Sequence, residues 1–410
     1  MKKRSPNFIV FDIGSSKIVA IAANINKQGK TNIGSQILQY SEGFDSGHIV
    51  NMERAENSIV RAIYALEQKC DKSINEVTIS LSGVGVKSYY MNNKILLNNQ
   101  VISKQDVKKL IKKTLSEFKV KDQEIVHYFP IEFIVNGNRS VENPVGLYAN
   151  ELSCQLHIIS ADSMMLMNLT KCLAKCHVEV NDIIVSAYAS AISCLNEDEK
   201  ELGCVVIDIG SNTTSFGIFV NNKIIYVDHV PVGSMHITKD IAKAFSIGLG
   251  LADKLKILYG HANPSLLIKD AIIKLDNLDS ENNRPDISIT EMQVAKIINS
   301  RIKGVLIDIK KKCHNISMNH LVTSVVITGG GGSLPGIKSI ASEIFQKQVR
   351  VAKPKNISKI PENYNPYIYS TALGMIESKS LQYRQNCFKS DRCESNGWLK
   401  NMFLWFKENV

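Results

Sequence analysis

The chain has 410 residues, of which 44% are hydrophobic, and its formal net charge is +10. A single hydrophobic core stops growing near about 250–300 residues, so the length predicts two or more domains. No apolar run approaches the ~20 residues that cross a bilayer, and the run at 8–11 is too short for a secretory signal, so we expect the chain in the cytosol. The nine cysteines include no CxxC pair, which favours reduced thiols over a metal site.

The first predicted element is a β-hairpin closed by a glycine turn. The string "FIVFD" runs into "IGSSK" and resumes as "IVAIAA", which is the pattern of two strands around a turn. Gly14 lets an anion approach the backbone closely, and the N–H groups and hydroxyls of Ser15 and Ser16 suit phosphate oxygens. Lys17 adds a positive charge for a phosphate, and Asp12 could hold a hydrated Mg²⁺.

Residues 103–118 predict an amphipathic helix. Ser103 and Asp106 have the spacing of a capping box. An apolar stripe follows at helical spacing, formed by Val107, Leu110, Ile111, Leu115 and Phe118. Taken alone, this pattern indicates a helix packed on a sheet.

A second copy of the hairpin follows. "CVVID" leads to "IGSNTTS" and then to "FGIFV", so the second aspartate stands 196 residues after the first (208 minus 12). One such turn is more often an ordinary Asp-Gly turn, but two copies predict a duplicated domain with one hairpin from each half at a shared cleft. The residues expected to hold phosphate or Mg²⁺ in this copy are Asp208, Gly210, Ser211, Asn212, Thr213 and Thr214.

A third glycine cluster lies between a predicted strand and a predicted helix, in "VVITGGGGSLPGIKSIASEIF" at 325–345. It fits neither GxGxxG nor a phosphate-binding GxxxxGK[ST] loop. Consecutive glycines let the backbone lie flat against a planar nucleoside, which makes Gly329, Gly330 and Gly331 candidates for that contact. The alternative is a flexible turn.

The C-terminal residues predict a flexible linker followed by a membrane-binding helix. Residues 378–397 are polar and aperiodic, as in a flexible linker. Residues 398–410 are too short to span a bilayer and place a broad apolar arc on one face, so the helix would lie in the membrane interface. That arc includes Trp398, Leu399, Met402, Phe403, Trp405 and Phe406. A basic tail suits anionic lipid; the other interpretation is a helix docked on the core of the chain.

Two phosphate hairpins followed by a strand–glycine turn are the pattern of the actin-like ATPase superfamily, which includes actin, sugar kinases and heat-shock chaperones. Within it, residues 125–160 resemble the bacterial cell-division FtsA family. That family carries Pro-x-x-[YF]-x-[VI]-[DN]-G and then N-P-V-G-[ML]. The matching residues are Pro130, Phe133, Val135, Gly137, Asn143, Pro144, Val145 and Gly146. Residues 233–260 and the tail look like that family too.

The resemblance implies an α/β, actin-like (ribonuclease H-like) fold of duplicated domains around a nucleotide cleft. It also implies an inserted α+β subdomain and a C-terminal amphipathic helix. The expected first subdomain takes residues 1–83 and 161–196, with the insert at 84–160. The second takes residues 197–226 and 304–377, with a small peptide-binding subdomain at 227–303. The linker at 378–397 and the membrane helix at 398–410 complete the chain.

The resemblance implies that ATP and Mg are the cofactors, and that Asp253 and Lys256 contact the ribose. The family usually has Glu where Asp253 stands. Its second hairpin commonly reads DIGGGTTD, whereas Ser211 and Asn212 replace two glycines here and Ser215 replaces the acid. No general base stands out, so we expect nucleotide binding with at most slow ATPase activity, and the catalytic residues stay unknown.

The resemblance further implies an adaptor that tethers the tubulin-like FtsZ ring to the cytoplasmic face of the inner membrane at the division site. The FtsZ C-terminal peptide would bind the 227–303 subdomain, where Arg301 matches a family arginine; Gly304 replaces a nearby family Glu. The other expected partners are the chain itself, as an actin-like filament, later division proteins and anionic lipid, with no nucleic acid.

Two alternatives share the hairpins. A sugar or acetate kinase would need a catalytic Asp facing a substrate pocket and would have no use for a tethered amphipathic tail. A pilus-assembly adaptor of the same superfamily also binds a peptide but should lack residues 398–410.

Overall fold

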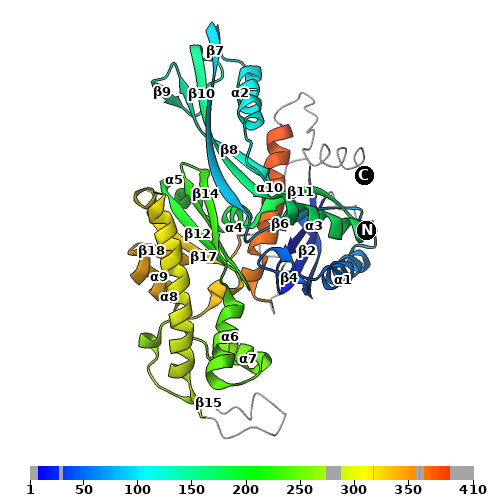
Figure 1. Cartoon of the computed structure of the whole chain (residues 1–410), viewed down its shortest axis with the longest axis vertical. Coiled ribbons are helices and arrows are strands. Elements are labelled where there is room, and N and C mark those ends of the chain that lie inside the picture. Colours follow the sequence, from blue (N-terminus) through cyan, green and yellow to red (C-terminus); the bar gives the residue numbers. More distant parts are fainter. Residues whose placement is uncertain are drawn as a thin grey trace.

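Two five-stranded sheets with the same strand order form the body of the protein (Figure 1). The structure, a computed structural model, describes residues 8–26, 31–273, 288–316, 318–355, 360 and 364–387. The first sheet has the order β11-β6-β1-β2-β3, and the second has the matching order β18-β17-β12-β13-β14. This repetition confirms the predicted duplication.

Each sheet combines three antiparallel strands with two parallel ones. The strands of the first sheet are β1 (Phe8–Ile13), β2 (Lys17–Ile25), β3 (Thr31–Tyr40), β6 (Glu76–Leu81) and β11 (Glu179–Val185). Those of the second are β12 (Cys204–Ile209), β13 (Thr214–Val220), β14 (Lys223–Val230), β17 (Ser324–Thr328) and β18 (Gln348–Val351). A small hairpin of β4 (Phe44–Asp45) and β5 (His48–Ile49) lies beside the first sheet.

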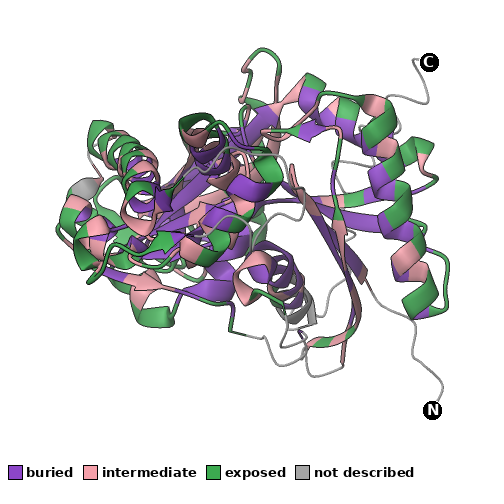
Figure 2. Cartoon of the chain, turned by 90° about the horizontal axis from the view of Figure 1, so that it is seen from below, coloured by how far each residue is buried: buried purple, intermediate pink, exposed green. Residues whose placement is uncertain are grey.

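The two predicted hairpins have the same register. Asp12 is paired with Val19 across β1 and β2, and Asp208 is paired with Ser215 across β12 and β13. The β1 and β12 strands are rich in Val, Ile and Phe because each is buried between helices, as strands next to parallel partners usually are. Figure 2 shows this burial, with the central strands mostly purple and the outer helix faces mostly green.

Helices cover the sheets and fill the space between the halves. Over the first sheet lie α1 (Met52–Cys70) and α3 (Ser163–Lys175), and on the second lie α8 (Glu291–Asn315) and α9 (Ile337–Phe345). Between the halves, α4 (Ser186–Cys194) crosses α10 (Ser370–Cys387). A Cβ on Gly374 would lie only 1.7 Å from the carbonyl oxygen of Ala189, so the crossing requires a glycine there. The short α5 (Glu197–Leu202) precedes β12.

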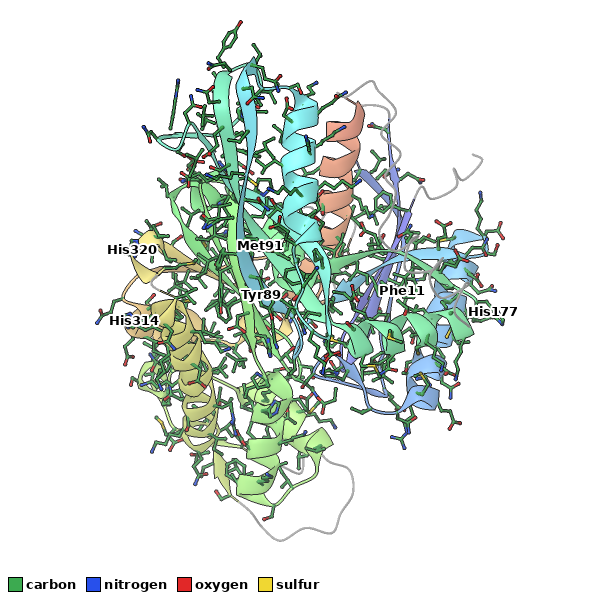
Figure 3. The ribbon with its side chains drawn as sticks, turned by 45° about the horizontal axis from the view of Figure 1, so that its top comes forward. Phe11, Tyr89, Met91, His177, His314 and His320 are labelled. Atoms are coloured by element: carbon green, nitrogen blue, oxygen red, sulfur yellow. The ribbon has the colours of Figure 1, made fainter. Side chains whose placement is uncertain are left out.

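The insert is a four-stranded antiparallel sheet that carries one helix. Its strands are β7 (Lys87–Val101), β8 (Gln123–Val135), β9 (Arg139–Val141) and β10 (Tyr148–Asp162), in the order β7-β10-β8-β9. Its helix α2 (Lys104–Ser116) begins with the predicted capping box of Ser103 and Asp106. Tyr89 and Met91 of β7, labelled in Figure 3, pack against the core of this subdomain.

The root of the insert is bonded to the edge strand β14 of the second sheet. Tyr90 donates from its hydroxyl to the carbonyl of Ile225 over 2.6 Å, and Ser88 accepts from the backbone N–H of Val227 over 2.8 Å. The imidazole of His157 lies 2.8 Å from the carbonyl oxygen of Ile224 through Nδ1. These side chains satisfy backbone groups of an edge strand that would otherwise be open to other chains.

The lower end of the molecule in Figure 1 is a small helical subdomain. It is built from α6 (Ser234–Phe245), α7 (Leu249–Tyr259) and the start of α8, with a short pairing of β15 (Ile272–Ile273) and β16 (Ile289–Thr290). The 3₁₀ turns are η1 (Pro264–Leu266), η3 (Asn319–Leu321), η4 (Gly330–Ser333) and η5 (Pro366–Tyr369). Because α8 is one continuous helix, it runs across the expected boundary between residues 303 and 304.

The helix α10 continues into the segment expected as a linker. It extends to Cys387, so residues 378–387 are helical rather than irregular. Tertiary contacts explain the difference, because Ser378 and Ser380 are buried and Lys379 forms an ion pair with Asp182 of β11. The polar composition of residues 378–387, which is also typical of a flexible linker, is therefore partly that of a packed helix face. Residues 388–410 lie outside the described residues.

None of the helices in the described ranges is long and apolar enough to cross a membrane.

Candidate functional site

The two glycine turns are closed by the same backbone hydrogen bond. The N–H of Gly14 donates to the carbonyl of Lys17 over 2.9 Å, and the N–H of Gly210 donates to the carbonyl of Thr213 over 2.9 Å. A Cβ on either glycine would lie 3.0 Å or 2.9 Å from that carbonyl oxygen. The closed turn therefore favours glycine at both positions, because a Cβ would crowd the carbonyl oxygen. This requirement is separate from the close approach of a ligand.

The carboxyl groups of the two aspartates at the strand ends are buried, and the charge of Asp208 acts on Asp12. Burial raises the pKa of Asp12 from 3.8 to about 7; a hydrogen bond from Ser80 opposes the rise, and the nearby Asp208 carboxylate adds to it. Burial also raises the pKa of Asp208. A carboxylate pair of this kind repels itself in the ionised form, and a cation between the two groups would relieve that repulsion.

Asp208 is held by hydroxyls from the two central helices. Ser190 of α4 donates to its Oδ2, and Thr371 of α10 donates to the same oxygen over 3.1 Å. The two hydroxyls are 3.0 Å apart. Hydrogen bonds from both oppose the rise in the pKa of Asp208, so they favour the ionised form.

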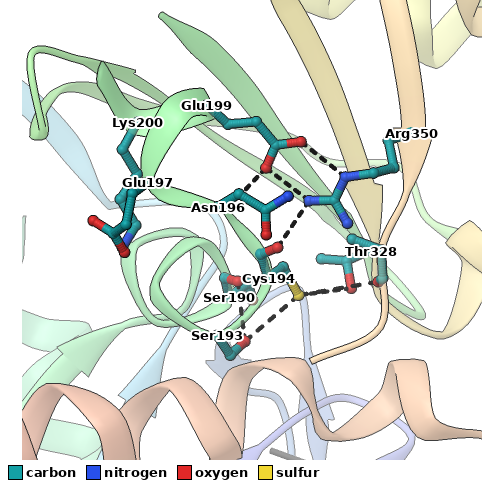
Figure 4. A network of polar contacts seen from close by, with 10 residues as sticks. Ser190, Ser193, Cys194, Asn196, Glu197, Glu199, Lys200, Thr328 and Arg350 are labelled. Atoms are coloured by element: carbon teal, nitrogen blue, oxygen red, sulfur yellow. Dashed lines mark hydrogen bonds and ion pairs between the residues drawn. The ribbon is translucent and has the colours of Figure 1, made fainter. Parts of the chain in front are cut away.

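The support of Asp208 extends into a buried polar network around the end of α4 (Figure 4). Ser193 donates to the carbonyl of Ser370 over 2.7 Å, and Cys194 donates to the hydroxyl of Thr328 over 3.4 Å. Arg350 of β18 donates to the carbonyl of Cys194 over 2.9 Å and forms a two-point ion pair with Glu199. This network joins α4, α10, β17 and β18 directly behind the site.

The third glycine cluster packs against the end of β12. A Cβ on Gly329 would lie 2.2 Å from Oδ1 of Asp208, and one on Gly331 would lie 2.5 Å from Cγ2 of Ile209. Gly331 is buried and Gly330 is partly exposed. Two of the three glycines therefore allow the turn to touch the second hairpin, and Gly330 is the one most open to a ligand.

The small polar residues of the turns differ in how far their side chains are open to a ligand. Thr214 is fully buried and its hydroxyl donates to the carbonyl of Val232 over 2.7 Å, so that proton is already used. Ser15 accepts from the N–H of Ser46 over 3.1 Å, and Ser211 donates to the amide oxygen of Asn212 over 2.8 Å. The side chains of Ser15, Ser16, Ser211, Asn212 and Thr213 are all partly exposed.

Asn212 makes a contact between the halves. Its amide nitrogen donates to the carboxylate of Asp45, in the β4–β5 hairpin, over 2.7 Å. This hydrogen bond is the main cause that lowers the pKa of Asp45. A residue that departs from the family pattern thus joins the second glycine turn to the first half.

The predicted ribose contacts form a network that joins α6 and α7. Lys256 donates to Asp253 over 2.6 Å and to the hydroxyl of Thr238 over 2.6 Å, and Thr238 also donates to Asp253 over 3.1 Å. Burial lowers the pKa of Lys17 in the first turn, and the charges of Asp253 and Lys256 also act on it. Lys17 is therefore near enough to α7 for its charge to interact with both residues.

Sequence reasoning missed four polar residues of this site. They are Ser80, Ser190, Thr371 and Asp45. Ser80 lies near the carboxyl end of β6, a parallel strand, which is a place where site residues gather and could have been noted. Ser190 and Thr371 sit inside helices among other small residues and give no comparable sequence signal.

A groove lies between α6 and α8, away from the glycine turns. Its volume is about 610 Å³, and Arg301 lines it together with Asp240, Lys296 and Gly304. Arg301 forms a two-point ion pair with Asp240, at 2.6 Å from Nε and 2.8 Å from Nη2. A Cβ on Gly304 would meet no atom within 4 Å, so packing does not require a glycine there.

The expected membrane residues lie outside the described residues. They are Trp398, Leu399, Met402, Phe403, Trp405 and Phe406.

Duplicated sheets, each ending in a glycine turn with an aspartate, together define a protein of the actin-like (ribonuclease H-like) class. Solved structures agree. A PilM–PilN type IV pilus biogenesis complex matches with a TM-score of 0.63 and 12% identity, over 92% of this chain and 99% of that one. MreB5 of Spiroplasma citri, a structure bound to AMPPNP, matches with a TM-score of 0.53 and 12% identity, over 92% and 98%. Identities this low show the fold alone.

Sequence comparisons identify the family. The model of the cell division protein FtsA matches residues 205–374, and that of the SHS2 domain inserted in FtsA matches residues 83–160. The cell division protein FtsA of Borreliella burgdorferi is 29% identical over 389 residues, covering 94% of each chain. That of Escherichia coli K12 is 26% identical over 409 residues, covering 97% of this chain and 96% of the relative. The chain belongs to the FtsA family of cell-division proteins.

Proposed function

We propose that this chain is a cell-division adaptor that binds ATP with Mg²⁺ between the two glycine turns and assembles into an actin-like polymer. It tethers the FtsZ ring to the cytoplasmic face of the inner membrane and recruits later division proteins. The observation that carries the nucleotide part is the pair formed by Asp12 and Asp208, one from each half. Membership of the FtsA family supports the rest.

The residues present fit a magnesium ion bound with a nucleotide. Mg²⁺ usually takes only one or two protein carboxylates and completes its shell with waters and phosphate oxygens. Asp12 and Asp208 supply two carboxylates whose mutual repulsion favours a cation between them. In the described part of the chain no group of three or more His, Cys, Asp or Glu residues comes together as a metal site, so phosphate and water oxygens would complete the shell. When bound, the ion would neutralise phosphate charge.

The two turns are assigned to the phosphates. Their backbone N–H groups after Gly14 and Gly210, with the partly exposed Ser15, Ser16, Ser211 and Thr213, provide donors from both halves. Lys17 adds a positive charge. Burial lowers the pKa of Lys17, and a bound phosphate would favour its charged form. Thr214 would contribute by fixing the shape of the turn rather than by donating its hydroxyl proton to phosphate, because that hydroxyl donates to the carbonyl of Val232.

The nucleoside is assigned to α7 and to the third glycine turn. Asp253 has Oδ1 occupied by Thr238 and Lys256, which leaves Oδ2 to accept from a ribose hydroxyl. Gly330 presents an open stretch of backbone, while Gly329 and Gly331 hold the turn against β12. The proposal assigns no general base, so ATP turnover would be slow at most.

The groove between α6 and α8 is assigned to the C-terminal peptide of FtsZ. Arg301 and Lys296 line it as cations, Asp240 and Asp308 line it as acids, and Val232 and Ile297 add apolar surface. Such mixed lining suits a short amphipathic peptide. The missing side chain at Gly304 widens the groove, which is where this chain departs from the family.

Co-sedimentation tests the adaptor role as a whole. The full chain and a chain that ends at residue 397 are each mixed with FtsZ and vesicles that contain phosphatidylglycerol, with and without ATP and Mg²⁺. We expect FtsZ to sediment with the vesicles only when the full chain is present, and more so with ATP because a polymer multiplies weak membrane contacts. Equal capture of FtsZ by the shortened chain would refute the anchor.

A further inference from the structure

The helix α2 and the residues after it carry a dense group of lysines. Between residues 103 and 121 there are seven lysines and two acidic residues. The lysines are Lys104, Lys108, Lys109, Lys112, Lys113, Lys119 and Lys121. No other described helix of similar length has this excess, and the division role assigned above does not use it.

The lysines point away from the core of the insert. Leu110 and Thr114 are buried against the sheet, and Phe118 packs edge-on against Tyr89 at 5.4 Å between ring centroids. At 100° per residue, this apolar side takes one half of the helix, and Lys108, Lys109, Lys112 and Lys113 take the other. Lys104 begins the helix, and Lys119 and Lys121 follow its end. All seven lysines are exposed. The result is a positively charged helix face turned to solvent.

The two acidic residues reduce the charge of this segment to +5 (seven minus two), and each is also held by a local partner. Asp106 accepts from the N–H and the hydroxyl of Ser103 at 2.8 Å and 2.6 Å, as the second half of the capping box. Glu117 accepts from the amide of Asn93 at 2.7 Å.

The charged face lies at the same end of the molecule as the C-terminal end of α10. In Figure 1 and Figure 3, α2 lies beside the C-terminal end of α10. Ten residues, 388–397, separate α10 from the expected membrane helix at 398. An extended chain covers at most ~3.5 Å per residue, so that helix starts within roughly 35 Å of the end of α10. A membrane that holds the tail is therefore within reach of α2.

We infer that the lysine face of α2 is a second contact with the membrane and binds anionic lipid headgroups. Charge complementarity and the shared end of the molecule identify this occupant. Lysine, a compact and flexible point charge, suits a mobile headgroup layer better than a defined pocket. The face also lacks exposed aromatic side chains in α2 on which nucleic-acid bases could stack. The contact would fix the orientation of the insert toward the bilayer.

This inference adds to the proposed tail anchor and uses it to bring α2 near the bilayer. The test replaces Lys104, Lys109, Lys112 and Lys119 by glutamine in the full chain. A matched control replaces four exposed lysines of the second half, Lys243, Lys269, Lys311 and Lys338, by glutamine. Both variants lose the same charge, and thermal unfolding checks that both remain folded. Binding is measured with vesicles of phosphatidylcholine alone and of phosphatidylcholine with phosphatidylglycerol.

We expect the α2 variant to bind the anionic vesicles at least roughly tenfold more weakly than the unmodified chain, since each lysine near such a surface contributes severalfold to affinity. Its binding to the neutral vesicles should not change, and the control should lose little on either. Equal binding of the α2 variant and the control to anionic vesicles would overturn the inference, even if removal of the tail abolished binding. Unchanged vesicle binding together with loss of an acidic protein partner would also overturn it, in favour of a protein-docking face.

Discussion

Thr371, the second residue of α10, donates to Oδ2 of Asp208 over 3.1 Å. The same oxygen accepts from Ser190 of α4. The helix that leads toward the C-terminal segment is thus bonded directly to an aspartate proposed to hold Mg²⁺. These two hydroxyls connect Asp208 to both α10 and α4.

Replacing Thr371 by Val should weaken binding of ATP with Mg²⁺ by about tenfold or more, because a hydrogen bond to a charged group is worth ~1.5–3 kcal/mol. The pKa of Asp208 should rise, since this hydrogen bond normally opposes the effect of burial. The pH below which binding is lost should therefore move upward, as seen by titration with a fluorescent ATP analogue. Ser193→Ala is the control, because Ser193 donates to Ser370 and not to Asp208. Identical pH profiles for the two variants would argue against this role.

Asp12→Asn should stabilise the nucleotide-free protein above pH 7. The raised pKa of about 7, against the ordinary 3.8, means that the ionised form disfavours the fold; this cost is full above pH 7 and absent below about pH 4. A difference of about three pKa units corresponds to up to ~4 kcal/mol in the free energy of unfolding. Urea unfolding at several pH values measures it. The gain should vanish near pH 4, and Mg²⁺ with ATP should stabilise the unmodified chain only.

Local patterns made much of this fold predictable. The two hairpins, the capping box at Ser103 and the strand–glycine–helix at 325–345 all follow from side-chain period and turn chemistry within a short window. The spacing between the two aspartates revealed the duplication because each half repeats the same local signal. The family segments then indicated the insert, which periodicity alone showed only as a helix on a sheet.

Contacts between distant segments were not predictable. Ser190 and Thr371 contact Asp208 only because α4 and α10 cross at Gly374, and the sequence of neither helix predicts that crossing. For the same reason the sequence alone predicts a linker from residue 378, since Lys379 has the character of a linker residue until its partner Asp182 is known. The sequence likewise does not show that Gly329 packs against Asp208 while Gly330 stays open to a ligand, because this close approach depends on tertiary packing.

Asn212→Ala should weaken ATP binding by about three- to fivefold. Its amide bond to Asp45 joins the halves beside the proposed phosphates, and an exposed hydrogen bond contributes roughly 1 kcal/mol. Asn212→Asp should have a larger effect, because two carboxylates would then face each other. Titration of each variant with ATP and Mg²⁺ measures the loss. If the Asp variant bound ATP as tightly as the Ala variant, the contact would not be maintained in the nucleotide-bound protein.

His157→Gln should remove part of the acid sensitivity of the protein. Burial lowers the pKa of His157 from 6.5 to about 4, so below pH 6.5 protons bind the unfolded chain first and stability falls as the pH falls toward 4. About 2.5 pKa units correspond to roughly 3 kcal/mol. The advantage of the unmodified chain over the variant in the free energy of unfolding should therefore shrink between neutral pH and pH 4.5. A constant difference across that range would exclude His157 as a source of the pH dependence.

Arg301→Ala should reduce binding of the FtsZ C-terminal peptide by at least about tenfold. The change removes one of the two cations that line the groove and leaves Asp240 without the partner that holds it at 2.6 Å and 2.8 Å, so the groove becomes more negative as well as less ordered. Fluorescence anisotropy of a labelled peptide measures the affinity. Lys303→Ala is the matched control, because Lys303 lies on the same helix but pairs with Glu343 and does not line the groove. An Arg301 variant that bound the peptide as well as the Lys303 variant would move the partner site away from the α6–α8 groove.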